Sequence, residues 1–544
     1  MPTRWKAAVG LVVVFTFLLS ACMSQAATDK SGLSDEQVLR LTETNQISSL
    51  DSAKYVDIVS WNVLYNVNEG LMRLGKENKP VYGIAEEVKI SPDKKVYTFK
   101  LREEAMWSDG EPVTAHDFEY AWKRALDPKT KSEYAYILYS IVGAEEYNKG
   151  KGKKEGVGVK AVDDHTLVVR LKKPQLTFLS LTTQSTYFPQ RKDIVEKYGD
   201  EYSKSPDKMV YNGPFVIQSV TPQKVVLKKN ENYWDANTVT LNRVEIIVAA
   251  DTPKRISLYN SGQADTAKLD QEFVSAYVQT PDYLNMELAS SQYILLNQRN
   301  KILRNDNIRR AISLAIDREE IANQILKDGS KPAGALVPPA LYVDNQSYRE
   351  LAGEKFVKRD VEKAQRYFQQ GLKELGLSKP PTSLTLLSFD DHRKYVALAV
   401  KKQLREALGL EVKLDSVPRK LKVPRELKGD FDLTMSSWFA DYSDPIGFLE
   451  IWKSDSGLNY MKFQNQEFER LLEKAELTTD QDKKTSYLAQ AEKLLVGEDG
   501  EAALVPLYYE TNSFLQRPYV KDLYRHPYGA EYDLKWAYIS KKKN

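Results

Sequence analysis

The chain has 544 residues, too many for one hydrophobic core, so we expect two to four domains. Its 78 Lys+Arg residues nearly balance 75 Asp+Glu residues, for a net charge of +3. This balance gives no electrostatic footprint of a nucleic-acid-binding protein or of a binder of acidic substrates.

The N-terminus has the pattern of a secretory signal, because two basic residues precede an apolar run over residues 7–19 that is short for a membrane span. Leu19-Ser20-Ala21-Cys22 follows and resembles the bacterial lipoprotein box. We therefore expect residues 1–21 to be removed, Cys22 to carry a lipid, and residues 22–34 to form a tether. The alternative is an ordinary secretory signal in which the chain's one cysteine stands by chance.

The first half of the chain predicts strands and helices in alternation. Apolar residues alternate over residues 37–42 and 96–102, which is typical of half-buried strands. A helix is expected over residues 60–69 with Gly70 as its C-terminal cap, and another begins near Thr114.

The second half predicts a parallel sheet. Residues 384–389, 391–408 and 411–417 read as strand, helix and strand, and such a unit makes its two strands parallel. The next strand, over residues 431–436, leads to Asp441. Ligands of open α/β sheets bind beyond the carboxyl ends of strands, where Asp441 is expected.

Asp441 has two readings. It stands among Trp438, Phe439 and Tyr442, and a carboxylate is costly to desolvate among aromatic rings unless a cation meets it. It is then a buried anion that binds the ammonium group of a ligand. The other reading is a turn aspartate that caps its own backbone.

Several motifs in order resemble a family of bacterial extracellular solute-binding proteins, the oligopeptide, dipeptide and nickel binders. They include Gly83-Ile84-Ala85-Glu86-Glu87, Trp107-Ser108-Asp109-Gly110-Glu111-Pro112, Asn212-Gly213-Pro214-Phe215 and Ala440-Asp441-Tyr442. The resemblance covers most of the mature chain and is strongest to the oligopeptide-binding lipoproteins of ABC importers.

The resemblance implies an α/β fold, a two-lobed periplasmic-binding-protein-like clamp (type II, cluster C) with an extra α+β domain. The implied first lobe is discontinuous. The expected ranges are 35–68, 192–290 and 512–544 for this lobe, 69–191 for the extra domain, and 291–511 for the second lobe. The lobes are expected to close on a ligand by hinge motion.

The resemblance also implies the site. Asp441 would pair with the α-ammonium of a peptide, and main-chain groups of Ser437 and Phe439 would pair with its backbone. Trp438 and Tyr442 would flank the carboxylate, and Tyr134 would form a wall of the cleft. A site that holds termini and backbone, and leaves side chains in hydrated space, suits ligands of varied sequence.

Two positions depart from some relatives. A glutamate near the peptide in those relatives falls here on Val56, with Asp57 beside it, and an arginine falls on Met435. Both differences leave the length of the ligand open.

The function implied is capture of oligopeptides for uptake by the permease subunits of an ABC transporter, at the outer face of the cytoplasmic membrane. Alternatives are a dipeptide, cell-wall-peptide or pheromone receptor of the same fold and, less favoured, a nickel or haem binder. The four histidines show no metal-ligand spacing, and no nucleophile motif indicates an enzyme. No cofactor, metal or nucleic acid is expected, and a monomer is expected because closure needs free lobes.

Overall fold

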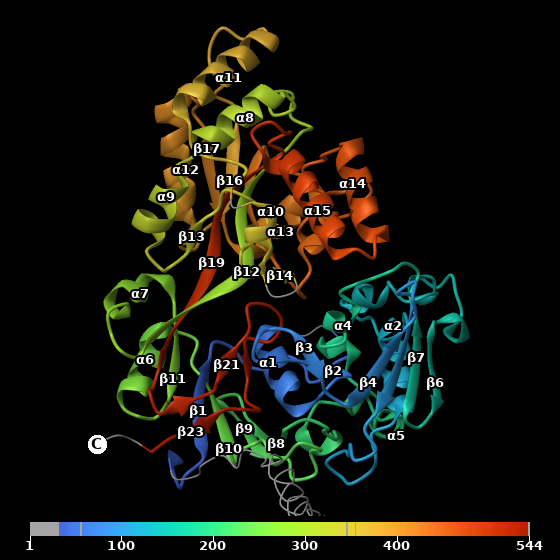
Figure 1. Ribbon diagram of the computed structural model, residues 1–544. Coiled ribbons are helices and arrows are strands. Elements are labelled where there is room, and N and C mark those ends of the chain that lie inside the picture. Colours follow the sequence, from blue (N-terminus) through green and yellow to red (C-terminus); the bar gives the residue numbers. More distant parts are fainter. Residues whose placement is uncertain (1–31, 55–56, 344–345, 354, 542–544) are drawn as a thin grey trace, which may run out of the picture.

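The computed structural model describes residues 32–54, 57–343, 346–353 and 355–541. The expected signal, Cys22 and Val56 lie outside these residues. The described chain forms two lobes, one above the other in Figure 1, and a third body beside the lower lobe. We call these bodies the first lobe (lower), the second lobe (upper) and the extra domain.

The first lobe is built on a four-stranded sheet with the order β1-β10-β9-β8. The strands are β1 (Val38–Glu43), β8 (Phe215–Val220), β9 (Lys224–Lys229) and β10 (Arg243–Val248). β1 pairs in parallel with β10, and the other neighbours are antiparallel. The predicted first strand is confirmed, with Leu39 and Leu41 buried.

Helix α1 (Ile58–Val67) packs in the first lobe, and its predicted C-terminal cap is wrong. The helix ends at Val67 and Asn68 is the cap, because the Asn68 amide donates to the Leu64 carbonyl. Glycine is required at position 70 by close packing and not by a helix cap. A Cβ there would lie 2.7 Å from the Thr182 carbonyl oxygen, so close packing against the backbone at Thr182 excludes a side chain.

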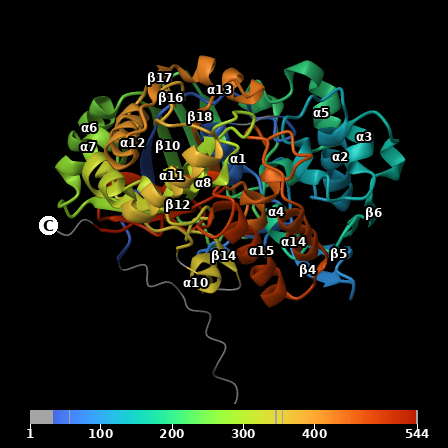
Figure 2. The same cartoon turned by 90° about the horizontal axis from the view of Figure 1, so that it is seen from above.

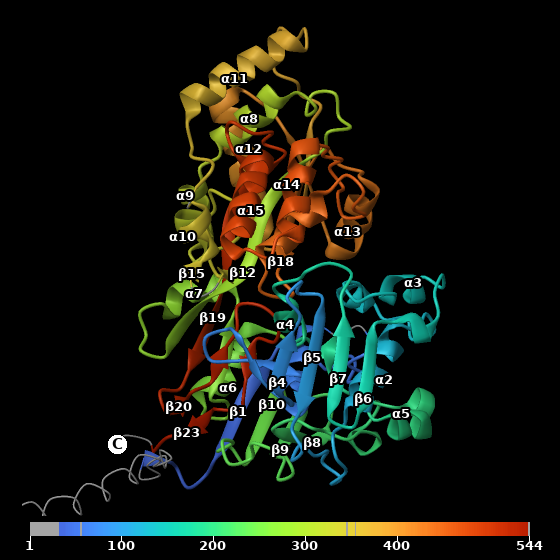
Figure 3. The same ribbon diagram turned by 45° about the vertical axis from the view of Figure 1, so that its right-hand side comes forward.

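The extra domain is an antiparallel sheet with the order β4-β5-β7-β6, covered by α2 (Figure 3). Its elements are β4 (Ala85–Ile90), β5 (Val96–Leu101), β6 (Val159–Asp163), β7 (Thr166–Arg170) and α2 (Ala115–Leu126). The predicted alternation in β5 and the N-cap Thr114 of α2 are confirmed. Seen from above, α2, α3 (Ala144–Asn148) and β6 project beyond the second lobe (Figure 2).

The second lobe contains the predicted parallel unit. β16 (Thr385–Phe389) pairs in parallel with β17 (Lys413–Val417), and α12 (Arg393–Leu408) connects them. The strand before Asp441 is β18 (Leu433–Phe439), and it also lies parallel to β16. The larger helices of this lobe are α8 (Asp306–Ala315), α11 (Val361–Glu374), α13 (Arg419–Lys428), α14 (Gln466–Leu477) and α15 (Gln481–Val496).

Two long strands connect the lobes. β12 (Tyr283–Leu296) and β19 (Leu504–Gln516) run antiparallel from the lower lobe to the upper lobe (Figure 1). β11 (Thr266–Leu269) pairs with β19, and β18 pairs with β12. The pairing of β12 with β19 shifts register between Glu287 and Ser291 and again between Gln292 and Tyr293, so the ladder is irregular there. The expected lobe boundaries, after residues 290 and 511, fall within these two strands and remain predictions.

Shorter elements complete the chain. Helices are α4 (Phe178–Leu181), α5 (Lys192–Tyr198), α6 (Thr252–Asn260), α7 (Gln271–Tyr277), α9 (Arg318–Glu320) and α10 (Tyr348–Ala352). Short strands include β2 (Met72–Leu74), β3 (Pro80–Tyr82), β13 (Lys331–Pro332), β14 (Tyr342–Val343), β15 (Gln346–Ser347), β20 (Val520–Lys521), β21 (Tyr524–Arg525), β22 (Tyr532–Asp533) and β23 (Tyr538–Ile539).

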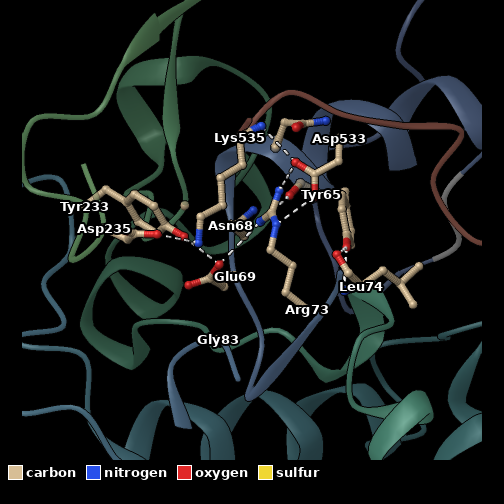
Figure 4. A network of polar contacts seen from close by, with 12 residues as sticks. Tyr65, Asn68, Glu69, Arg73, Leu74, Gly83, Tyr233, Asp235, Asp533 and Lys535 are labelled. Carbon is tan, nitrogen blue, oxygen red and sulfur yellow. Dashed lines mark hydrogen bonds and ion pairs between the residues drawn. The ribbon is translucent and has the colours of Figure 1, made fainter. Parts of the chain in front are cut away.

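A buried polar network joins the extra domain to the first lobe (Figure 4). Arg73 of β2 forms a two-pronged ion pair with Asp533, at 2.7 and 2.8 Å. Glu69 accepts from the Tyr233 hydroxyl at 2.7 Å and lies 3.4 Å from Arg73. All four side chains are buried, so the network fixes the extra domain to the lobe beneath it.

Candidate ligand-binding site

The local structure around Asp441 is a strand followed by a turn. β18 spans Leu433–Phe439, three residues beyond the predicted end, so Ser437 and Phe439 belong to the strand. The Ala440 amide still bonds to the Ala289 carbonyl at 2.8 Å, and the 3-10 helix η8 (Pro445–Phe448) begins soon after. Asp441 therefore stands in a turn just past the carboxyl end of a strand, as predicted.

The strand before Asp441 has an open edge. β18 pairs with β12 along its whole length, but it pairs with β16 only at Leu433 and Thr434. From Met435 to Phe439 the edge that faces away from β12 has no strand neighbour among the described residues. The main chain around Ser437 and Phe439 can thus accept one further strand.

A cavity of about 690 Å³ lies between the extra domain and the second lobe, beside Asp441. Its volume is that of a small-molecule or short-peptide site. Of the predicted site residues, Trp438, Asp441 and Tyr442 line it, whereas Ser437, Phe439 and Tyr134 do not. Its aromatic and acidic lining consists of Tyr136, Tyr139, Trp438, Tyr442, Phe448, Asp441, Asp444 and Glu450.

The extra domain closes over Asp441 with Tyr136, not with Tyr134. The Tyr136 hydroxyl donates to an Asp441 carboxylate oxygen at 2.9 Å. The Tyr134 ring stacks on the Tyr136 ring, with centroids 5.8 Å apart, and so supports this wall from behind. Sequence reasoning missed Tyr136, which lies two residues after Tyr134 in the 3-10 helix that spans Ala135–Leu138.

Asp441 is a carboxylate without a cation. Burial raises its pKa to about 6, and the hydrogen bond from Tyr136 offsets part of that rise. Among the described residues, no Lys, Arg or His nitrogen lies within 4.0 Å of it. The alternative reading as a backbone cap is not supported, because no backbone amide donates to this side chain in the described chain. The arrangement suits a cationic group supplied from outside.

Asp444, three residues on, has a structural role. It is buried, caps η8 through the Ile446 amide, and forms an ion pair with Lys484 at 2.7 Å. Thr177 of the extra domain donates to it at 2.8 Å. Its hydrogen bonds and charge are therefore satisfied, and it does not form an acid–base pair with Asp441.

Asp57, which follows the departure at position 56, and Met435, the second departure from the family pattern, are both described. Asp57 is the N-cap of α1; burial alone would raise its pKa, but hydrogen bonds from Ser48 and Ser60 lower the pKa overall. Met435 is buried in the core of the second lobe, its sulfur 3.5 Å from the Ser388 hydroxyl. Neither residue lines the cavity.

Comparison with known proteins identifies the family. The model of "Bacterial extracellular solute-binding proteins, family 5 Middle" matches residues 79–460. The chain belongs to this family. The predicted α/β two-lobed clamp is thereby confirmed, since solved members of the family share the fold over nearly the whole chain.

Individual relatives are similar over nearly their whole length. The Dipeptide-binding protein DppE of Bacillus subtilis is 36% identical over 97% of this chain and 98% of its own. The Oligopeptide-binding protein OppA of the same organism is 33% identical over 95% and 96%. The structure of Listeria monocytogenes OppA bound to peptide matches with a TM-score of 0.76 and 37% identity, over 94% of this chain and 100% of that one.

The described residues include no candidate metal site and no candidate membrane-spanning helix. No group of three or more His, Cys, Asp and Glu side chains is arranged to hold a metal ion there. Within the same residues, no helix has the length and apolar character needed to cross a bilayer.

Proposed function

We propose that this protein captures short peptides outside the cell and delivers them to the permease of an ABC importer. The observation that carries the proposal is Asp441, a partly buried carboxylate without a cation, placed in a cavity next to an open strand edge. The names of its relatives, dipeptide- and oligopeptide-binding proteins, support peptides as the ligand class.

The two features bind different parts of one ligand. The α-ammonium of the peptide replaces the Tyr136 hydroxyl on Asp441 and forms a charge-assisted hydrogen bond in a site of low polarity. The peptide backbone then adds to the free edge of β18 beside Ser437 and Phe439. Neither contact depends on side chains, so peptides of many sequences are accepted. Trp438 and Tyr442 complete the walls.

The remaining parts of the proposal concern the partners and the location. A lipid on Cys22 and a tether over residues 22–34 would hold the protein, as a monomer, at the outer face of the cytoplasmic membrane. The cavity is expected to act in binding and not in catalysis, because the relatives are named as peptide-binding proteins and the buried Asp444 is held in an ion pair by Lys484.

Calorimetry with tetra-alanine tests this function. Asp441→Asn, which keeps the shape and removes the charge, is expected to cost about 2–5 kcal/mol of binding free energy. N-acetyl tetra-alanine is expected to bind the wild type as poorly as the free peptide binds the variant. Asp455→Asn, an exposed change in the same lobe, is the control. Equal affinity for free and acetylated peptide would contradict ammonium capture.

A further inference from the structure

The cavity holds a second carboxylate that the proposed function does not use. Glu450 is half-buried and opens the 3-10 helix η9 (Glu450–Trp452), and its side chain lines the same cavity as Asp441. Among the described residues, no side-chain hydrogen bond or ion pair within 4.0 Å engages its carboxylate.

The other charges around the cavity are paired. Asp444 is bound to Lys484 at 2.7 Å, and Lys453 lies 3.6 Å from Glu476. Asp441 and Glu450 are thus the two lining carboxylates without an ion pair within 4.0 Å among the described residues, although Lys453 and Lys484 lower the pKa of Glu450 from further away. The α-ammonium of a peptide neutralises one of them and leaves the other.

Asp441 and Glu450 both affect the same two tyrosines of the cavity wall. Each raises the pKa of the Tyr136 hydroxyl and that of Tyr442, in addition to the larger effect of burial. Burial, with repulsion from Asp444 and Glu476, raises the pKa of Glu450 to about 7. An anion held in this way among aromatic rings is stabilised by a second cation, which the rings also attract.

We propose that Glu450 selects peptides whose first residue carries a positively charged side chain, such as lysine, arginine or ornithine. This inference rests on the proposed function, because Asp441 must hold the α-ammonium. We assign the positive side chain to the first residue of the peptide, because that side chain is attached to the same carbon as the α-ammonium and therefore stays in the cavity near Glu450. Later residues follow the edge of β18 out of it.

The test uses isomeric peptides, which share composition and net charge. Lys-Ala-Ala-Ala is expected to bind the wild type at least about tenfold more tightly than Ala-Ala-Ala-Lys, measured by calorimetry at pH 8, where Glu450 is ionised. The same peptide with an Nε-acetyl-lysine at the first position keeps the stem and loses the charge. It is expected to lose the advantage.

Glu450→Gln removes the charge with little change of shape, and Asp455→Asn is the matched control on an exposed residue nearby. The Gln variant is expected to bind the two isomers within about twofold of each other, whereas the control keeps the full preference. Isomers that bind the wild type equally, or a preference that survives Glu450→Gln, would overturn the role of Glu450 and leave peptide binding intact. If neither isomer bound the wild type, the proposed function itself would fail, and this inference with it.

Discussion

At the scale of single residues, Asp441 prepares the site for a cation and lowers the stability of the unliganded protein. Its pKa is 3.8 in an ordinary setting and about 6 in the fold. A carboxyl whose pKa is raised by folding favours the unfolded chain once it ionises, so this cost is absent below about pH 4 and complete above about pH 6. The side chain that prepares the site for a cation therefore destabilises the empty protein.

The consequence can be measured as a gain in stability from a loss of function. Asp441→Asn is expected to stabilise the unliganded protein by about 1–2 kcal/mol at pH 8, a value discounted for partial exposure, and to have almost no effect at pH 4. Chemical denaturation of both proteins at the two pH values checks this. A variant less stable than the wild type at pH 8 would show that Asp441 has a structural partner.

Residue-level reasoning from the sequence reached Asp441 with its flanking Trp438 and Tyr442, but not the other residues around it in the cavity. Aromatic flanks and the end of a strand marked the aspartate, whereas Tyr136 meets it across 305 positions of chain. Glu450 was missed for a similar reason. Its local context is an ordinary apolar helical turn, and only the fold shows that it lines the same cavity as Asp441.

At the scale of elements, local patterns predicted most strands and helices, and tertiary contacts decided their ends. The alternation in β5 and the strand–helix–strand unit of β16, α12 and β17 could be read directly from the sequence. The end of β18 could not, since two serines interrupt its pattern and pairing with β12 carries it on to Phe439. The end of α1 was missed because Gly70 is required by packing against Thr182.

The buried network around Arg73 predicts a large element-level effect. Arg73→Met leaves Asp533 and Glu69 buried without their cation, and is expected to cost about 3–5 kcal/mol of unfolding free energy. The control is Arg470→Met, which removes an exposed pair with Glu467 and should cost less than about 1 kcal/mol. Urea denaturation compares them, and equal costs would show that the network does not fix the extra domain.

At the scale of the whole molecule, the crossing strands β12 and β19 are the expected hinge. The register shift between Glu287 and Ser291 interrupts their ladder next to the expected lobe boundary after residue 290. Contacts such as Tyr136 with Asp441 and Thr177 with Asp444 meanwhile bridge the extra domain and the second lobe. A ligand in the cavity lies between the extra domain and the second lobe, so its binding should change the contacts between them.

Small-angle scattering measures this change. The radius of gyration of the protein is expected to fall when a saturating tetrapeptide is added, because the lobes close on the ligand by rotation at the hinge. Asp441→Asn at the same peptide concentration should keep the radius of the empty protein. An unchanged radius with bound peptide would mean that the empty protein is already closed.

A crystal structure with a bound tetrapeptide tests the central claim most directly. The account predicts the peptide nitrogen at its free amino end within about 3 Å of an Asp441 carboxylate oxygen, with the Tyr136 hydroxyl displaced and the peptide backbone along β18. A peptide that lay in the cavity with its carboxyl end toward Asp441, or with its amino end far from residue 441, would contradict it.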